Sequence, residues 1–227
     1  MTAHQDMLRM LLARRGAAEL PAGYRAVEFI QSGGEQVINT GFSFSGNRLV
    51  FNAEAWWQAR SGEDDLFGTG VYGRNNVVLG AISSDHWFLY TRYRSSVPVD
   101  GSIPRPTADA KQTLSFTLDK AAVSRSFTVD GSTSTSDTYN TDSTASQNLV
   151  LFAGGANYKL GHYKLYRAEI IEDGIAMRRF VPCVREADSK PGLYDLCGFA
   201  ASDTGTPFYT NNGTGADFTW GELQQGE

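Results

Sequence analysis

Cysteine, proline and histidine are scarce in this chain of 227 residues, which has two, seven and three of them, respectively. Two cysteines are too few for the dense disulfide framework of a small secreted domain. The three histidines are isolated from one another and lack a partner at metal-ligand spacing, so we expect no metal site. The chain also lacks a run of ~20 apolar residues and a secretory leader pattern, and we therefore expect neither membrane insertion nor a signal peptide.

An excess of positive charge is absent as well. The chain has 20 basic and 25 acidic residues, a formal net charge of -5 and a sequence pI of about 5.3. This balance gives no general attraction to phosphate backbones, so nucleic-acid binding is not expected. Nucleophile-elbow, Walker and dinucleotide-binding patterns do not occur in the sequence, and we predict no cofactor.

The chain does have the composition of an aromatic, glycine-rich β protein. Hydrophobic residues make up 41%, aromatic residues 12%, and there are 24 glycines, which suits a packed core with many turns. Short runs of alternating apolar and polar residues recur between Gly, Asn and Asp positions. This rhythm predicts an all-β antiparallel sandwich. The expected strands are 24–30, 36–40, 48–58, 66–70, 76–82, 87–94, 112–118, 124–129, 148–153, 164–171 and 175–183, with 132–147 as a polar edge strand and a surface loop.

The clearest local signal is a long hairpin around Asp173-Gly174, a pair that suits the positive φ values of a tight turn. Side chains alternate along a strand, so we expect Tyr166, Ala168 and Ile170 to share the core face of its first strand. Pro182 lacks an amide donor and is expected to end the second strand.

The first nineteen residues follow a helical period instead. Thr2 to Gln5 fits a capping box, and Gly16 suits a helix end. We expect an amphipathic helix whose apolar stripe is formed by Met7, Leu8, Leu11 and Leu12. A helix of this length is not stable alone. Two alternatives stay open: the helix packs on its own sandwich, or residues 1–19 are an arm that docks the domain 20–227 on another protein.

Several blocks of sequence resemble a known family. They are Leu20-Pro-Ala-Gly-Tyr24, Val27-Glu-Phe-Ile30, Gln36-Val-Ile-Asn-Thr-Gly41, Arg179-Phe-Val-Pro-Cys183, Pro191-Gly-Leu-Tyr-Asp195 and Pro207-Phe-Tyr-Thr-Asn211. Over residues 20–221 they resemble the concanavalin A-like lectin/glucanase (laminin-G-like) domains of phage tail, prophage and gut-bacterial surface proteins. The resemblance implies a jelly-roll β-sandwich that acts in binding or in virion architecture. It does not by itself imply catalysis.

The sequence gives no pattern for glycoside hydrolysis. Retaining glucanases of this superfold need two carboxylates ~5 to 5.5 Å apart, which a Glu-x-Asp-x-Glu strand would supply. That pattern is missing, and the nearest cluster, Glu63-Asp64-Asp65, is interpreted as a solvated turn. We predict no catalytic residue and no enzyme activity. A calcium site would need several acidic side chains of the loops to converge on one point. The acids in the expected loops are interpreted as ordinary surface residues; they are Asp100, Asp137, Asp142 and Asp203.

A surface for a ligand is suggested by aromatic residues on strands. Rings beside polar donors suit stacking on the apolar face of a sugar. The candidate residues are Trp57, Trp87, Tyr90, Arg92 and Tyr93. In the pair Trp56-Trp57, one ring is expected in the core and the other outside. Ordinary packing of both faces of strand 87–94 is the alternative.

Our leading hypothesis is a non-enzymatic virion structural, decoration or host-adhesion module, made in the host cytoplasm and attached to a virion or other assembly protein through its N-terminal helix. The alternatives are a lectin domain that binds a cell-surface glycan and a glycoside hydrolase. A homo-oligomer stays open. Cys183 and Cys197 are expected as separate thiols, with one disulfide as the alternative.

The docking arm makes a direct prediction. Deleting residues 1–16 is expected to leave the sandwich folded, with a thermal midpoint within a few degrees of the full chain, and to abolish joining to its assembly. Circular dichroism on heating and co-sedimentation with the assembly measure the two effects. Normal assembly of the truncated chain would show that the arm has been misinterpreted.

Overall fold

The computed structural model describes residues 20–57, 63–69, 77–82, 86–91, 110–136, 148–154, 160–201 and 205–224. All regular secondary structure in these ranges is β. None of these ranges contains a helix long and apolar enough to cross a membrane. Residues 1–19 lie outside them, so the N-terminal helix and its stripe stay a prediction.

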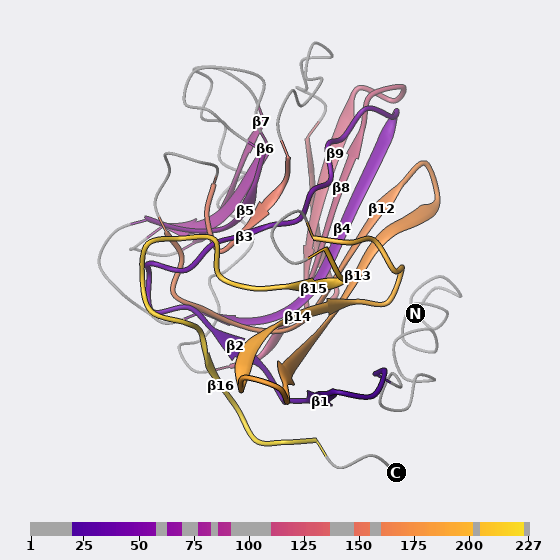
Figure 1. Ribbon diagram of the computed structural model, residues 1–227. Helices are drawn as coiled ribbons and strands as arrows, with labels where there is room; N and C mark the ends of the chain where they lie inside the picture. Colours follow the sequence, from indigo (N-terminus) through magenta and orange to yellow (C-terminus); the bar gives the residue numbers. More distant parts are fainter. Residues whose placement is uncertain are drawn as a thin grey trace.

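The strands follow the alternating segments of the sequence (Figure 1). They are β1 (Tyr24–Ala26), β2 (Ile30–Gln31), β3 (Ile38–Asn39), β4 (Arg48–Trp57), β5 (Glu63–Gly68), β6 (Val77–Ile82), β7 (His86–Thr91), β8 (Gln112–Asp119), β9 (Ser124–Val129), β10 (Ser132–Ser136), β11 (Val150–Leu151), β12 (Tyr163–Glu172), β13 (Ile175–Arg185), β14 (Lys190–Asp195), β15 (Phe208–Tyr209) and β16 (Thr219–Trp220).

Eleven of the described strands form one sheet and five form the other. The main path of the large sheet is β10-β9-β8-β4-β12-β13-β14-β15, with β1 beside β13 and β2 between β12 and β16. The small sheet has the order β3-β11-β5-β6-β7. Every pair of named strands is antiparallel. The expected all-β antiparallel architecture is confirmed, and β10 lies at the predicted sheet edge.

Aromatic rings join the inner faces of the two sheets. The ring centroid of Phe67 in β5 lies 4.1 Å from that of Phe51 in β4 and 5.8 Å from that of Phe116 in β8. All three side chains are fully buried. Such ring pairs add ~0.5 to 1.5 kcal/mol each beyond the burial of their area, so they hold the two layers of the sandwich together.

The long hairpin formed by β12 and β13 is confirmed, and β12 is central to the large sheet. Asp173 and Gly174 have φ values of 48° and 84°, as a tight hairpin turn requires. β12 pairs with β4, β13 and β2. The free end of the hairpin is anchored by side chains, because Glu172 accepts hydrogen bonds from the amides of residues 45–46 and Asp173 from those of residues 47–48.

The predicted core face of β12 is wrong at Tyr166. Leu165 pairs with Ala55 and Arg167 with Glu54, so β12 has one residue more than β4 at this point. Tyr166 is the extra residue of this bulge, and a bulge reverses the alternation of side chains. Ala168 is buried as expected, whereas Tyr166 is partly exposed on the outer face.

Pro182 does not end β13, which continues to Arg185. The carbonyl oxygen of Pro182 accepts a hydrogen bond from the amide of Val27 at 3.1 Å. The N and O atoms of one strand residue point to the same side, so the missing donor of Pro182 faces the N-terminal segment. Pro182 lies opposite Leu193 in the ladder with β14, and this ladder does not need an amide donor from Pro182.

Two further expectations are corrected. The single strand 24–30 is divided into β1 and β2, because β1 pairs with β13 whereas β2 pairs with β12 and β16. The segment Glu63–Asp65 is no solvated turn, since it starts β5 and Asp65 is 4% exposed. The C-terminal tail closes the sandwich beside the N-terminal segment, with β16 on β2 and the Phe218 ring 4.9 Å from the Phe152 ring.

The closeness of β5 to the chain after β11 leads to a stability prediction. A Cβ atom at Gly68 would clash with the backbone oxygen of Gly154, which cannot rotate away. Gly68→Ala is therefore expected to lower the free energy of unfolding by ~1 to 3 kcal/mol in urea denaturation. The control is Gly33→Ala, where a Cβ meets only Gln36 Oε1 at 3.8 Å, and its effect should stay within ~0.5 kcal/mol. Equal losses in both variants would contradict this account.

Candidate functional site

The structure separates the two adjacent tryptophans of β4. Trp57 is 2% exposed and belongs to the core cluster. A ring buried to this degree cannot stack on a sugar, so Trp57 is removed from the candidate ligand residues. Trp56 is partly exposed on the opposite, outer face. Its neighbours on that face are the polar residues Asn52 and Glu54, and this alternation in the sequence was the available signal for choosing Trp56.

Trp56 belongs to a group of aromatic and basic residues that the sequence analysis did not identify. We call this group the aromatic-lysine cluster; it consists of Phe29, Trp56, Lys111, Lys164 and Tyr166. The rings are partly exposed on the outer face of the large sheet. The residues come from four separate segments of the chain, which only the pairing of the strands brings together.

Strand register explains why these residues meet. Lys164 of β12 lies opposite Trp56 of β4 on one side and opposite Gln31 of β2 on the other. At the bulge both Tyr166 and Arg167 face outward, and the ring centroid of Tyr166 lies 5.5 Å from that of Phe29. Gly221 leaves room for the Phe29 ring, because a Cβ there would lie 2.6 Å from Phe29 Cε1.

Both lysines of the cluster lie over rings. The Nζ atom of Lys164 is 4.5 Å from the ring centroid of Phe29 and 4.7 Å from that of Trp56. The Nζ atom of Lys111 is 4.7 Å from the ring centroid of Tyr166. Cations at this distance are attracted by the negative face of a ring, by ~0.5 to 1 kcal/mol at exposed sites.

The charges around the cluster are unevenly paired. Glu54 receives both the Lys111 ammonium, at 3.0 Å, and the guanidinium of Arg167. Partial burial, assisted by the carboxylates of Glu28 and Glu54, raises the pKa of the Tyr166 phenol above its usual value. Tyr166 therefore keeps its proton at neutral pH and can donate a hydrogen bond.

Two of the other predicted ligand residues lie on the other sheet. Trp87 and Tyr90 lie on β7 of the small sheet, where they pair with residues 81 and 78 of β6. Arg92 and Tyr93 lie outside the described residues, as do the four loop acids considered for calcium. A surface on strand 87–94 thus stays a prediction.

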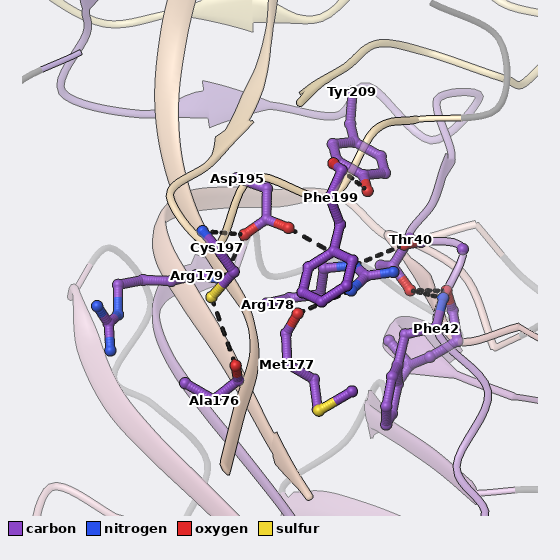
Figure 2. Close-up of polar contacts among 12 residues, drawn as sticks. Thr40, Phe42, Ala176, Met177, Arg178, Arg179, Asp195, Cys197, Phe199 and Tyr209 are labelled. Atoms are coloured by element: carbon purple, nitrogen blue, oxygen red, sulfur yellow. Dashed lines mark hydrogen bonds and ion pairs between the residues drawn. The ribbon is translucent and has the colours of Figure 1, made fainter. Parts of the chain in front are cut away.

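A second polar site is buried at the junction of β13, β14 and the segment after β3 (Figure 2). Arg178 is 6% exposed and Asp195 is fully buried. The Nε atom of Arg178 donates to the carbonyl oxygen of Thr40 at 3.0 Å and lies 3.7 Å from Asp195 Oδ2. The Phe199 ring covers the guanidinium, with 4.3 Å between the ring centroid and Cζ.

The two carboxylate oxygens of the buried Asp195 differ in their hydrogen bonds. Oδ1 accepts hydrogen bonds from the amides of Arg179 at 2.8 Å and Cys197 at 3.0 Å. Oδ2 accepts no hydrogen bond from the described residues and relies on the Arg178 charge. Burial raises the pKa of Asp195, while these amides and Arg178 act in the opposite direction. The arrangement ties three chain segments together, so we assign it a structural role.

The cysteines are separate free thiols, as the sequence analysis favoured. Burial raises the pKa of the Cys183 thiol to about 12, so that it stays protonated at neutral pH. Cys197 donates a weak hydrogen bond from Sγ to the carbonyl oxygen of Ala176, at 3.5 Å. Within the described ranges, no three His, Cys, Asp or Glu side chains gather as they would around a metal ion.

Comparisons with known proteins find distant structural similarity only. No protein-family model and no curated protein matches the chain. The chain is similar to the CBM40 module of the Ruminococcus gnavus IT-sialidase bound to α2,3 sialyllactose, with 13% identity, a TM-score of 0.49, and coverage of 64% of this chain and 90% of that one. It is also similar to a heptameric SAP-like pentraxin from Limulus polyphemus, with 6% identity, a TM-score of 0.41, and coverage of 65% and 74%.

A third similarity is to the NanB sialidase of Streptococcus pneumoniae, with 12% identity, a TM-score of 0.43, and coverage of 87% of this chain but 39% of that one. The chain thus spans about two fifths of the length of that sialidase. All three TM-scores are below 0.5, and the fold described above is assigned from the strand pairing of this chain.

The buried ion pair makes a pH-dependent prediction. Arg178→Met leaves Asp195 buried without its counter-charge, and we expect the free energy of unfolding to fall by about 3 to 5 kcal/mol near neutral pH. Without Arg178, the pKa of Asp195 in the folded state rises further above its unfolded value. The contribution of this carboxyl to stability is then greatest below the unfolded pKa and is lost as pH rises through the folded pKa. The loss caused by Arg178→Met therefore shrinks on acidification.

Urea unfolding of both proteins between pH 4 and pH 8 measures this effect. The matched control is the neighbouring Arg179→Met, whose partner Glu169 lies 3.1 Å away on the partly exposed outer face. Exposed pairs contribute ~0 to 1 kcal/mol, so this control should lose little at any pH. A pH-independent loss in Arg178→Met would argue against an uncompensated charge at Asp195.

Proposed function

We propose that this chain is a non-catalytic carbohydrate-binding module whose ligand surface is the aromatic-lysine cluster. The observation that carries the proposal is the gathering of three partly exposed rings, from Phe29, Trp56 and Tyr166, on the outer face of a polar antiparallel sheet. Sugars present an apolar C–H face beside their hydroxyl groups, and a ring with adjacent polar donors matches both.

The polar groups around the rings suit the recognition of hydroxyl groups. The phenol of Tyr166 is protonated at neutral pH, and the lysine ammonium groups supply further donors. On the neighbouring strands, Ser115 Oγ donates to Asn52 Oδ1 at 2.8 Å, and the amide of Asn52 adds a hydrogen-bonding group on the same face. This row of small polar side chains extends the surface beyond the rings.

The charges around the rings suit the binding of a saccharide better than the hydrolysis of its glycosidic bond. Glu54 is paired with Lys111 and Arg167, an arrangement that suits a structural anion better than a proton donor. A glycoside hydrolase needs a carboxyl pair across the scissile bond, one member of which carries a proton. The charge arrangement at the cluster does not resemble that requirement.

The virion role and the jelly-roll class remain predictions from the family resemblance. The virion role depends on residues 1–19, whereas the proposed binding surface lies wholly within the described residues. The two hypotheses are compatible, because a host-adhesion module is also a protein that binds a surface glycan. We give the glycan-binding function first place, since it rests on named contacts.

The experiment is a glycan array followed by titration calorimetry on the strongest ligand. Trp56→Ala is expected to weaken binding at least tenfold, because stacking and shape are lost together, and Phe29→Ala should act in the same direction. Phe199→Ala is the matched control, since it removes a ring that is 44% exposed and lies over the buried Arg178 rather than in the cluster.

Trp87→Ala distinguishes this surface from the one predicted on strand 87–94. Loss of binding in Trp87→Ala with full binding in Trp56→Ala would move the site to the small sheet. Absence of any glycan ligand on the array and in calorimetry at millimolar concentration would overturn the function itself. Thermal unfolding of each variant confirms that it is folded before its affinity is compared.

A further inference from the structure

The two lysines of the aromatic-lysine cluster differ in their ion pairs. Among the described residues, Lys164 forms no ion pair with a carboxylate. Lys111 and Arg167 share Glu54, while no carboxylate among the described residues lies within 4.0 Å of Lys164. Its ammonium group lies over the rings of Phe29 and Trp56, 4.5 and 4.7 Å from their centroids. The two lysines therefore differ, since one is neutralised by a neighbour and the other is not.

A ring contact holds an ammonium group less strongly than a charge-assisted hydrogen bond to an anion does. The lysine stem is flexible, and its head has three donors that can turn toward a ligand. An anionic group that approaches Lys164 can therefore draw the ammonium away from the rings. The ring faces that the ammonium leaves are then free to stack on the apolar face of the same saccharide.

We propose that the cluster selects anionic saccharides, in which a carboxylate or sulfate group stands beside an apolar sugar face, and that Lys164 is the residue that determines this specificity. This inference rests on the proposed glycan-binding function. The anion is placed at the end of the cluster formed by Trp56 and Phe29. At the opposite end, near Tyr166, both cations, Lys111 and Arg167, already pair with Glu54, and Glu28 adds a further carboxylate.

The experiment compares charged saccharides with neutral partners of the same shape. Calorimetry at low salt measures the affinity of galacturonic acid oligosaccharides and of their methyl esters, and separately of a sulfated cello-oligosaccharide and its unsulfated parent. The wild-type chain is expected to bind a charged form about tenfold more tightly than its neutral partner, which corresponds to about 1.4 kcal/mol. The arm that shows the preference identifies carboxylate or sulfate as the recognised group.

Three variants test the role of Lys164. Lys164→Gln is expected to bring the ratio of charged to neutral affinity to about one, and Lys164→Arg to restore most of the preference; the readout is this ratio, since loss of a donor also lowers the affinity for the neutral form. Lys120→Gln is the matched control, because the Lys120 ammonium also lies over a ring, 4.0 Å from the Phe44 centroid. It stands beside Asn47, at the other end of β4 from Trp56, and should leave the ratio unchanged.

The outcomes separate this inference from the function on which it rests. Equal affinity for charged and neutral forms in both arms overturns the anionic specificity and leaves glycan binding intact. A preference that survives in Lys164→Gln overturns the assignment to Lys164. Failure to bind any of the four saccharides or any array glycan overturns both proposals together.

Discussion

β12 has one residue more than its partner β4 at Tyr166, and this β-bulge determines which side chains of β12 lie on the outer surface of the sheet. Before the bulge, Leu165 faces the core opposite Ala55; after it, Ala168 does so opposite Ala53. Without the extra residue, the strand would continue in its first phase and turn one set of side chains to the wrong side. The bulge thus keeps the apolar side chains of both halves of β12 in the core and places two successive residues, Tyr166 and Arg167, on the outer face.

A second constraint holds the ends of the sheets in place. Arg178 reaches from β13 to the carbonyl oxygen of Thr40, and the Thr40 hydroxyl donates to the carbonyl oxygen of Leu149 at 2.6 Å. One buried guanidinium thereby links the large sheet to the segments that lead into and out of the small one. The guanidinium of Arg178 is a buried positive charge, and the carboxylate of Asp195 compensates it. This explains why a carboxylate lies at a position where burial raises its pKa. The polar junction and the aromatic core hold the same two layers together by different means.

Local chemistry made much of the fold predictable. Asp173-Gly174 and the alternation on either side of it define the hairpin without reference to other strands, and β4 and β9 follow their apolar periods closely. The face of Tyr166 was not predictable, because a bulge is defined against a partner strand and a single segment contains no sign of it. The binding surface was missed for the same reason. Phe29, Trp56 and Lys164 are far apart in sequence, and their meeting depends on β2 and β4 flanking β12.

The lysines that lie over the rings allow the outer face of the large sheet to resist association with other chains and still to bind a ligand. Partly exposed rings on an antiparallel sheet favour association with other chains, because their apolar faces gain from burial. Ammonium groups cover those faces with charge and keep them hydrated, and a cation on a flexible stem can be moved at little cost when a better partner arrives. Covering by a fixed aliphatic side chain would give the same protection from water but would close the surface permanently. The cluster therefore has the properties of a surface that is protected when free and open to a ligand that offers both an apolar face and a polar group.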